Sequence, residues 1–477
     1  MLTTPDQNTS APKTKATCAC DTIVASWAVK RARSACLGEA VYAHEGKSFC
    51  VMHYPNQNKV EVFRSKLQQK LDAADFNFCG IYFPEDINFA DYQKLSDDKF
   101  CFVADADFSF AEFSGATFFY KTIFSEKVYF NQTNFIGVAW FSNATFNGTA
   151  HFRFATFGNI TSFINATFSG LTSFKGAQFH SKTNFNNAQF KDYVIFKYCD
   201  INDLKYALST GKIKHSYKQD IKMFGAYASL DFDSLQIEKP ERLSFHSVKL
   251  RPHWFINTDP RKFEFIDVRW ENDLKKEREA SNSDRLLSIA YGQLAMNAEE
   301  NNRYDEAMDF RKKSMETSLF SLQEKWREDW LKRRWGKYSF ETFSWWWEYG
   351  TIRKLFSLTW WYRTLSSYGE SPTRAAIALL LILFLSCVPY WFTGFASSKD
   401  TTPNNKGVPL RMIIEPKENK AKQFLATLVY SLETASLQKP EPRPVTTMAR
   451  LFVGLETILA PLQAALLALA IRRKYMR

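Results

Sequence analysis

The sequence predicts a multidomain protein: a repeat solenoid, a helical region and a two-span α-helical membrane domain with a pore-helix-like segment. Three observations predict this organisation: a phenylalanine ladder, a cluster of tryptophan and basic residues, and two long apolar segments near the C-terminus. At 477 residues the chain is too long for one compact domain. We expect a Cys/His leader at 1–60, the solenoid at 85–200, a β-rich cap at 201–272, a helical hairpin at 273–335, interfacial aromatic-basic helices at 336–373 and the membrane domain at 374–477.

Composition narrows the classes of partner. A formal net charge of +12 is compatible with binding either to nucleic acid or to an anionic membrane surface. Because the C-terminus is apolar, we favour a lipid bilayer and expect no nucleic-acid partner. The first residues are polar, so no secretory signal peptide is predicted. The eight cysteines do not form a paired extracellular framework, which indicates a reducing compartment.

Cysteine and histidine cluster in the first 60 residues. The pairs Cys18-Ala-Cys20 and Cys50-Val-Met-His53 lie about thirty residues apart and together offer four donors, the number that zinc takes. Cys36 or His44 could substitute for one of them. We predict a structural zinc site with Cys18, Cys20, Cys50 and His53 as ligands. The alternative is free thiols beside a surface histidine.

The ladder places phenylalanine at alternating intervals of six and five residues from Phe102 to Phe196. The residue two before each rung is usually Ala or Thr. Short fixed periods are typical of solenoids, in which each unit buries its apolar face against its neighbours. An eleven-residue period also occurs in right-handed coiled coils, but a segment rich in Phe, Thr, Asn and Gly is a poor helix.

This pattern resembles the pentapeptide-repeat family, whose units centre on Leu or Phe with a small residue two before it. The resemblance implies a right-handed quadrilateral β-helix with the central residue pointing inward. Since every second interval is six, a coil would take about 22 residues, and we expect the extra residue to bulge at a corner. Between Phe102 and Phe196 the chain has five acidic and six basic residues, so DNA mimicry is excluded and an interaction scaffold is favoured. The sequons at Asn143 and Asn165 fall at repeat positions and are expected to face solvent.

Irregular strands and then helices should follow the ladder. We interpret 201–272 as a cap on the open end of the solenoid. Ser283-Asp284 is a helix start signal, and Asn301-Asn302-Arg303 interrupts the helical pattern. Eight of the 13 tryptophans lie between Trp326 and Trp361, interleaved with Arg and Lys. This composition suits a membrane interface better than single-stranded nucleic acid.

The C-terminal region contains two predicted spans, 375–398 and 451–471, with a shorter apolar segment at 421–436 between them. This order resembles the pore domain of two-transmembrane potassium channels, and Tyr430-Ser-Leu-Glu-Thr434 matches the end of that family's pore helix. The filter departs from the family, since Ser436-Leu-Gln-Lys-Pro-Glu441 lacks both glycines. Potassium selectivity is therefore not expected.

Glu456 is the residue with the most specific predicted role in this region, because a carboxylate inside a span should face a pore, a cavity or a partner. The alternative is that it reaches the interface or pairs with Arg443 or Arg450. Pro461 could act as an inner-helix hinge. The residues expected to line a pore are Glu433, Thr434, Ser436, Gln438, Glu456 and Gln463.

The sequence thus favours a bacterial inner-membrane protein with both termini cytoplasmic, since positive residues flank both spans. The first hypothesis is an oligomeric, by resemblance tetrameric, channel of non-potassium selectivity, gated through a ligand or protein on the solenoid. The alternative is a non-conducting, membrane-tethered scaffold. No catalytic or cofactor motif is present, so we expect no enzyme.

Overall fold

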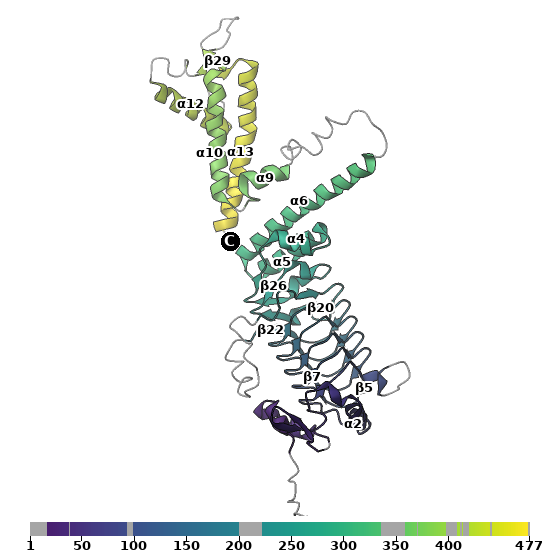
Figure 1. Cartoon of the computed structure of the whole chain (residues 1–477). Helices are drawn as coiled ribbons and strands as arrows, with labels where there is room; N and C mark the ends of the chain where they lie inside the picture. Colours follow the sequence, from purple (N-terminus) through teal and green to yellow (C-terminus); the bar gives the residue numbers. More distant parts are fainter. Residues whose placement is uncertain are drawn as a thin grey trace, which may run out of the picture. The chain divides into compact units, whose positions relative to one another are not determined.

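The computed structural model describes residues 17–37, 39–92, 99–199, 222–334, 358–369, 371–396, 408–410, 413, 419–438 and 441–475 (Figure 1). The chain divides into two compact units, Met1–Glu328 and Asp329–Arg477, which we describe separately.

The first unit is a β-solenoid of four parallel sheets. Val128 pairs with Ala106 on one side and Ala150 on the other, so one coil takes 22 residues, as predicted. The first face contains β6 (Ala106–Asp107), β10 (Val128–Tyr129), β14 (Ala150–His151), β18 (Thr172–Ser173), β22 (Val194–Lys197), β25 (Leu243–His246) and β27 (Glu264–Ile266). The second face contains β3 (Tyr82–Phe83), β7 (Glu112–Phe113), β11 (Asn134–Phe135), β15 (Thr156–Phe157) and β19 (Gln178–Phe179).

The remaining two faces complete each coil. The third face contains β4 (Ile87–Asn88), β8 (Thr117–Phe118), β12 (Ala139–Trp140), β16 (Thr161–Ser162), β20 (Lys182–Asn184) and β23 (Ser229–Asp231). The fourth face contains β5 (Cys101–Phe102), β9 (Ile123–Phe124), β13 (Thr145–Phe146), β17 (Thr167–Phe168), β21 (Gln189–Phe190) and β24 (Gln236–Ile237). A further parallel pair joins β26 (Lys249–Leu250) to β28 (Arg269–Trp270).

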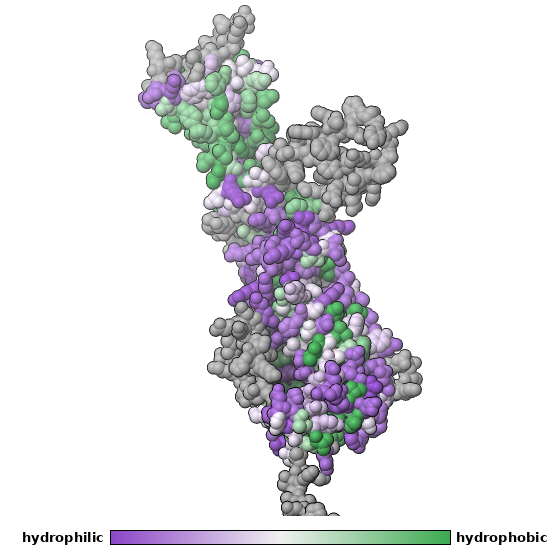
Figure 2. Space-filling model, in the orientation of Figure 1, coloured by the Kyte–Doolittle hydropathy of each residue, from purple (hydrophilic) through white to green (hydrophobic). Residues whose placement is uncertain are grey.

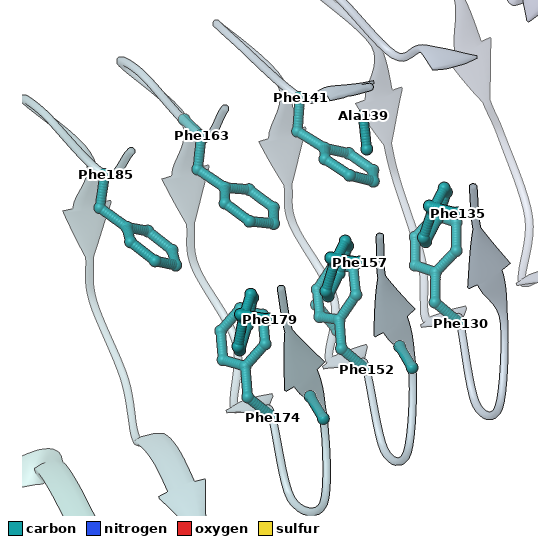
Figure 3. Packing of buried hydrophobic residues seen from close by; sticks show 14 of the residues in the cluster. Phe130, Phe135, Ala139, Phe141, Phe152, Phe157, Phe163, Phe174, Phe179 and Phe185 are labelled. Carbon is teal, nitrogen blue, oxygen red and sulfur yellow. The ribbon is translucent and has the colours of Figure 1, made fainter. Parts of the chain in front are cut away.

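The ladder phenylalanines fill the interior, which confirms the predicted inward direction (Figure 3). Rings one coil apart stack in parallel, as for Phe141 and Phe163, whose centroids lie 4.9 Å apart with planes 9° apart. Rings on opposite faces of one coil meet edge-on, as for Phe130 and Phe141. Both arrangements are favourable for aromatic quadrupoles. The small residue before each rung leaves room for this packing.

The backbone explains the asparagines of the sequon-like triplets. Asn143 and Asn165 have φ values of 58° and 56°, in the left-handed region that asparagine tolerates better than most residues. The same conformation recurs at Lys121, Gln132 and Asn187. These turns fall within the five-residue intervals, so the tight corners belong to the shorter intervals of the ladder.

Short helices and one β-hairpin cover the N-terminal end of the solenoid. They are η1 (Ala19–Thr22), η2 (Ser26–Ala28), α1 (Val29–Ser34), the hairpin β1 (Tyr42–His44) and β2 (Lys47–Phe49), η3 (Gln57–Lys59) and α2 (Val60–Asp72), with η4 (Phe89–Asp91) in the first coil. We call residues 17–72 the N-terminal cap. The amide of Tyr82 donates to the carbonyl of Met52 at 3.0 Å, and the Phe63 ring packs edge-on against Phe83. The cap therefore shields the first β-edge, which would otherwise be open for pairing.

Of the region 201–272 that we expected to be a cap, residues 201–221 lie outside the described residues, and the strands from Ser229 to Trp270, β23 to β28, add onto the sheets of the solenoid or pair with each other. Three short helices, η5 (Pro240–Arg242), η6 (Pro252–Phe255) and η7 (Pro260–Lys262), lie in these coils, and α4 (Leu274–Ala280), α5 (Asp284–Glu300) and α6 (Tyr304–Arg334) follow. The Ser283 side chain caps α5, as predicted. The Asn297 amide of α5 donates to the carbonyls of Pro260 and Phe263 at 3.1 and 2.8 Å. Helix α5 thus covers the last coil.

The second unit contains two long apolar helices. Its elements are α9 (Leu358–Ser366), α10 (Pro372–Phe392), β29 (Gly394–Ala396), β30 (Val408–Pro409), α12 (Lys420–Ala435), β31 (Arg443–Pro444) and α13 (Thr447–Tyr475). Pro372–Phe392 and Thr447–Arg472 are long and apolar enough to cross a membrane, by length and composition. Apolar side chains cover their outer surfaces, visible as the green helices in Figure 2, and Leu380 and Ile458 are 65% and 68% exposed. Residues 336–357 of the predicted interfacial segment 336–373 lie outside the described residues, as do Lys439 and Pro440 of the degenerate filter.

Candidate metal centre and polar cluster of the apolar helices

Thiols and an imidazole gather inside the N-terminal cap. Cys18 and Cys20 lie at the start of η1, Cys36 follows α1, and Cys50 and His53 flank the turn after β2. The ligand atoms of Cys18, Cys20, Cys36 and His53 all lie within 4.8 Å of one another. This group could hold a metal ion, in agreement with the predicted cluster.

The imidazole Nδ1 of His53 is the focus of the cluster. It lies 3.1 Å from the Cys50 Sγ, 3.5 Å from the Cys36 Sγ and 3.9 Å from the Cys18 Sγ. The Cys20 Sγ is 3.6 Å from the Cys36 Sγ. All four predicted ligands thus gather, and Cys36, considered only as a substitute, is among them.

His44, the other substitute considered, has its own surroundings. It lies on β1, where its ring packs edge-on against Tyr54 and at an angle to Phe49. Its Nε2 lies 4.0 Å from the Glu45 carboxylate. His53 is therefore the imidazole that the fold directs into the cluster.

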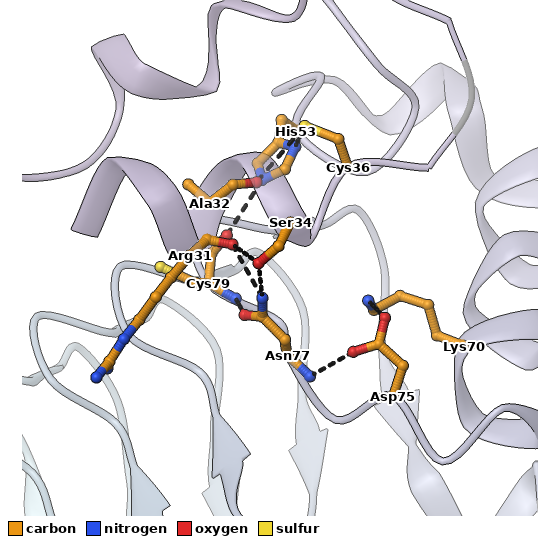
Figure 4. Close-up of polar contacts among 9 residues, drawn as sticks. All are labelled: Arg31, Ala32, Ser34, Cys36, His53, Lys70, Asp75, Asn77 and Cys79. Carbon is orange, nitrogen blue, oxygen red and sulfur yellow. Dashed lines mark hydrogen bonds and ion pairs between the residues drawn. The ribbon is translucent and has the colours of Figure 1, made fainter.

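Hydrogen bonds orient the donors before any metal binds. The His53 Nε2 lies 3.1 Å from the carbonyl oxygen of Cys79, which leaves Nδ1 as the nitrogen facing the thiols (Figure 4). The amide of Cys50 donates to the Cys18 Sγ at 3.3 Å. The buried side-chain nitrogen of Lys59 donates to the carbonyls of Val51 and Met52 at 2.6 and 3.0 Å and fixes the turn between Cys50 and His53.

The thiols share protons through mutual contacts. Contact with Cys20 raises the pKa of Cys18, but contacts with Cys36, Cys50 and His53 outweigh it and lower that pKa to about 5. Contacts with Cys18 and Cys36 lower the pKa of Cys20, while contacts with Cys18, Cys20 and Cys50 raise the pKa of Cys36. Thiolates, which bind metals, are therefore favoured within the cluster.

The cluster lies where the cap meets the first coil. The Asn77 amide donates to the Arg31 carbonyl at 2.9 Å and to the Ser34 hydroxyl at 2.7 Å (Figure 4). The Arg31 guanidinium donates to Asp107 on β6 at 3.0 Å. Gly80 has a φ of +73°, and a side-chain carbon there would lie 3.0 Å from Val24 of the cap. A metal in the cluster would reinforce this junction.

A second polar cluster lies among the apolar helices. Glu456 of α13 is buried, and its two carboxylate oxygens accept from the Tyr390 hydroxyl of α10 and the Ser431 hydroxyl of α12. The Ser431 hydroxyl also lies 3.1 Å from the Leu383 carbonyl oxygen. One carboxyl group thus joins all three helices. The sequence pattern did not single out Tyr390, although a polar ring within an apolar segment is a signal for such a role.

The other residues predicted to line a pore are Gln463 on α13 and a group at and just beyond the end of α12, namely Glu433, Thr434, Ser436 and Gln438. The Gln463 amide is buried and donates to the Ala375 carbonyl at 2.9 Å. The Thr434 hydroxyl donates to the Tyr430 carbonyl, while the Ser436 hydroxyl and the Gln438 backbone amide both donate to the Glu433 carbonyl. Ser436 and Gln438 are exposed, and Pro461 lies within α13.

Comparison with known proteins assigns the repeat. The pentapeptide-repeat family model, which describes nine copies, matches residues 119–163, 141–189 and 163–204. The match lies within the solenoid and agrees with the resemblance found in the ladder. No curated protein matches the chain.

Proposed function

We propose that this chain is a non-catalytic, membrane-anchored scaffold whose solenoid binds a protein partner. The observation that carries this proposal is that Glu456 and the side-chain nitrogen of Gln463, both buried and both predicted to line a pore, are bonded within one copy of the chain, although the Gln463 Oε1 lacks a partner among the described residues. Glu456 is held by Tyr390 and Ser431, and Gln463 by the Ala375 carbonyl. Side chains that line a conducting pore must face a wet lumen. The internal bonds instead suit a role in tying α10, α12 and α13 together.

The distribution of apolar and charged residues supports a membrane anchor. A soluble core helix would bury the side chains that α10 and α13 leave exposed. The bond between Gln463 and Ala375 places the C-terminal half of α13 beside the start of α10, so that Arg374 and Arg472 lie toward the same end of the helix pair. Positive residues favour the cytoplasmic side. We therefore propose a bacterial inner membrane with both termini in the cytoplasm.

The third face of the solenoid suits a protein partner. Phe118 and Trp140 point outward from β8 and β12, while Tyr120, which follows β8, and Ile160, which precedes β16, are 44% and 43% exposed. Further along the same face the outward residues become polar, as at Asn184. Aromatic side chains are enriched in protein interfaces, whereas nucleic acid calls for basic ones. This apolar region is where we place the partner.

The test combines localisation, conductance and cross-linking. The full chain should stay in the membrane fraction after alkaline carbonate extraction, and purified protein in liposomes should pass no ions. A photo-cross-linking amino acid at position 140 should capture a discrete partner in cells, while the matched probe at Thr167 on the fourth face should not. Release by carbonate would refute the anchor, and equal capture at both positions would refute the partner surface.

An oligomeric channel is the second candidate. The order of α10, the 16-residue α12 and α13, with Ser436 and Gln438 exposed beyond α12, is the observation in its favour. Two spans cannot enclose a pore, so this candidate requires a homo-oligomer, by resemblance a tetramer. Discrete single-channel currents whose ion selectivity changes in Glu456→Ala would establish it over the scaffold.

We also propose that the metal of the N-terminal cap is zinc and that its role is structural. Sulfur and imidazole donors are the set that zinc prefers, and four protein donors close its coordination shell. The cluster joins segments that are otherwise connected only through short helices and one hairpin. Zinc would thereby stabilise the cap against the first coil.

A further inference from the structure

The N-terminal cap offers five donors, one more than a tetrahedral zinc site takes. They are the thiols of Cys18, Cys20, Cys36 and Cys50 and the imidazole of His53. One thiol must therefore be left out of a mononuclear site. The distances around His53 indicate which one.

Bond lengths set the spacing that a tetrahedral site requires. With Zn–S of about 2.3 Å and Zn–N of about 2.05 Å, sulfur and nitrogen ligands lie ~3.6 Å apart. The Sγ atoms of Cys50, Cys36 and Cys18 lie 3.1, 3.5 and 3.9 Å from the His53 Nδ1. These three distances bracket the required sulfur–nitrogen value, so each of the three thiols can share an ion with the His53 Nδ1 after small shifts.

Local chain geometry also favours Cys50 over Cys20. Cys50 and His53 are separated by two residues, within the spacing that paired zinc ligands usually show. Cys18 and Cys20 are separated by one, which is shorter than that spacing. The Cys20 Sγ contacts the Cys36 Sγ and the Cys18 carbonyl oxygen, at 3.6 and 3.8 Å. Cys20 thus belongs to the same cluster, within 4.8 Å of the Cys18, Cys36 and His53 ligand atoms, but its closest contacts are with Cys36 and the first turn of η1 and not with the His53 Nδ1.

The surrounding hydrogen bonds select the same four atoms. The Cys79 carbonyl oxygen accepts a hydrogen bond from the Nε2 of His53, which leaves Nδ1 directed to the thiols. The Cys50 amide donates to the Cys18 Sγ, an interaction that stabilises a thiolate ligand. These bonds come from the turn that carries Cys50 and His53, and from the first coil.

We propose that Cys18, Cys36, Cys50 and the His53 Nδ1 hold zinc, and that Cys20 packs beside the ion without binding it. This inference rests on the proposed zinc in the cap and names its ligands. The ion then joins the start of η1, the end of α1 and the turn after β2. Its loss would loosen the cap from the solenoid while leaving the coils intact.

Metal content of the detergent-purified full chain tests this ligand set. Wild-type protein and Cys20→Ser should each carry one zinc per chain, and cobalt should give them the same thiolate-to-cobalt absorption. Cys50→Ser should lose the metal, and Cys50→His, which supplies a nitrogen donor in place of the lost sulfur, should recover it. Loss in Cys20→Ser with retention in Cys50→Ser would overturn the ligand set in favour of Cys20. Wild-type protein without zinc, after reconstitution with excess metal, would refute the proposed zinc itself.

Hydrogen exchange of the same proteins separates metal loss from misfolding. In Cys50→Ser the amides of the cap should exchange faster, while those of the middle coils keep wild-type protection. A chelator should speed exchange in the cap of wild-type protein and of Cys20→Ser but leave Cys50→Ser unchanged. If the cap amides of wild-type protein keep their protection from exchange in chelator, the proposal that zinc holds the cap against the solenoid is overturned.

Discussion

Replacing Phe119 by alanine tests the ladder most directly, because the neighbouring Phe118 provides a matched control. Phe119 is fully buried, and its ring stacks in parallel on Phe89 and Phe141 at 5.1 and 5.0 Å. Phe118 is the last residue of β8 and directly precedes Phe119, but it points outward and is half-buried. The two substitutions remove the same atoms, so any difference reports the interior packing.

The magnitude follows from the packing. Truncating a buried phenylalanine to alanine costs about 3–5 kcal/mol, the upper values applying where the cavity cannot collapse. Rings above and below Phe119 are held in register by their own strands, so little collapse is expected. Each lost aromatic pair adds about 0.5–1.5 kcal/mol. We expect about 5 kcal/mol for Phe119→Ala and below about 1 kcal/mol for Phe118→Ala.

Hydrogen exchange measured by mass spectrometry is the appropriate assay, because a chain of several domains does not unfold in two states. The Phe119 and Phe141 amides donate to the Trp140 and Ser162 carbonyls of the next coil. Their protection should fall by roughly three to four orders of magnitude in Phe119→Ala. Protection at Phe185, three coils further on, should fall less, because solenoid units couple mainly to their neighbours. Equal losses in both variants would refute the argument.

Three further predictions address other parts of the chain. Glu456→Ala should release the three apolar helices from one another, which limited proteolysis in detergent would detect as faster digestion. Glu456→Gln keeps a polar atom at each of the two carboxylate oxygen positions and should be digested like wild type. Identical digestion of all three proteins would contradict the structural role of Glu456. Gly137→Ala should destabilise its coil by about 2–3 kcal/mol, since the added carbon would lie 2.4 Å from the Gly115 carbonyl oxygen, and undiminished amide protection there would count against the close coil contact. Burial, helped by Arg153, lowers the pKa of His151 below its ordinary 6.5, so the unfolded chain binds more protons and solenoid stability should fall as the pH drops below about 6.5. Urea unfolding of wild type and His151→Asn across this range should show a shallower fall in the variant, and parallel curves would remove His151 as a cause.

The sequence alone determined the structural elements that depend on residues close together in the chain. The alternating intervals of the phenylalanine ladder require neighbouring units to stack, because no single unit can bury its own rings. The 22-residue coil, the inward phenylalanines and the outward polar positions all follow from that period. Ser283 marked the start of α5 for a similar reason, since a helix cap depends on residues three apart.

Only the tertiary structure decided which distant side chains meet. Glu456 and Tyr390 are 66 residues apart, and no periodic pattern connects them. The Cys/His cluster was visible as a group, yet the placement of Cys36 around His53 depends on how α1 packs against the turn after β2. The Cys79 carbonyl that orients His53 comes from the first coil, 26 residues away. A repeat fixes contacts between neighbouring units, whereas a polar site depends on packing between separate elements, and a single sequence specifies that packing only through the folded chain.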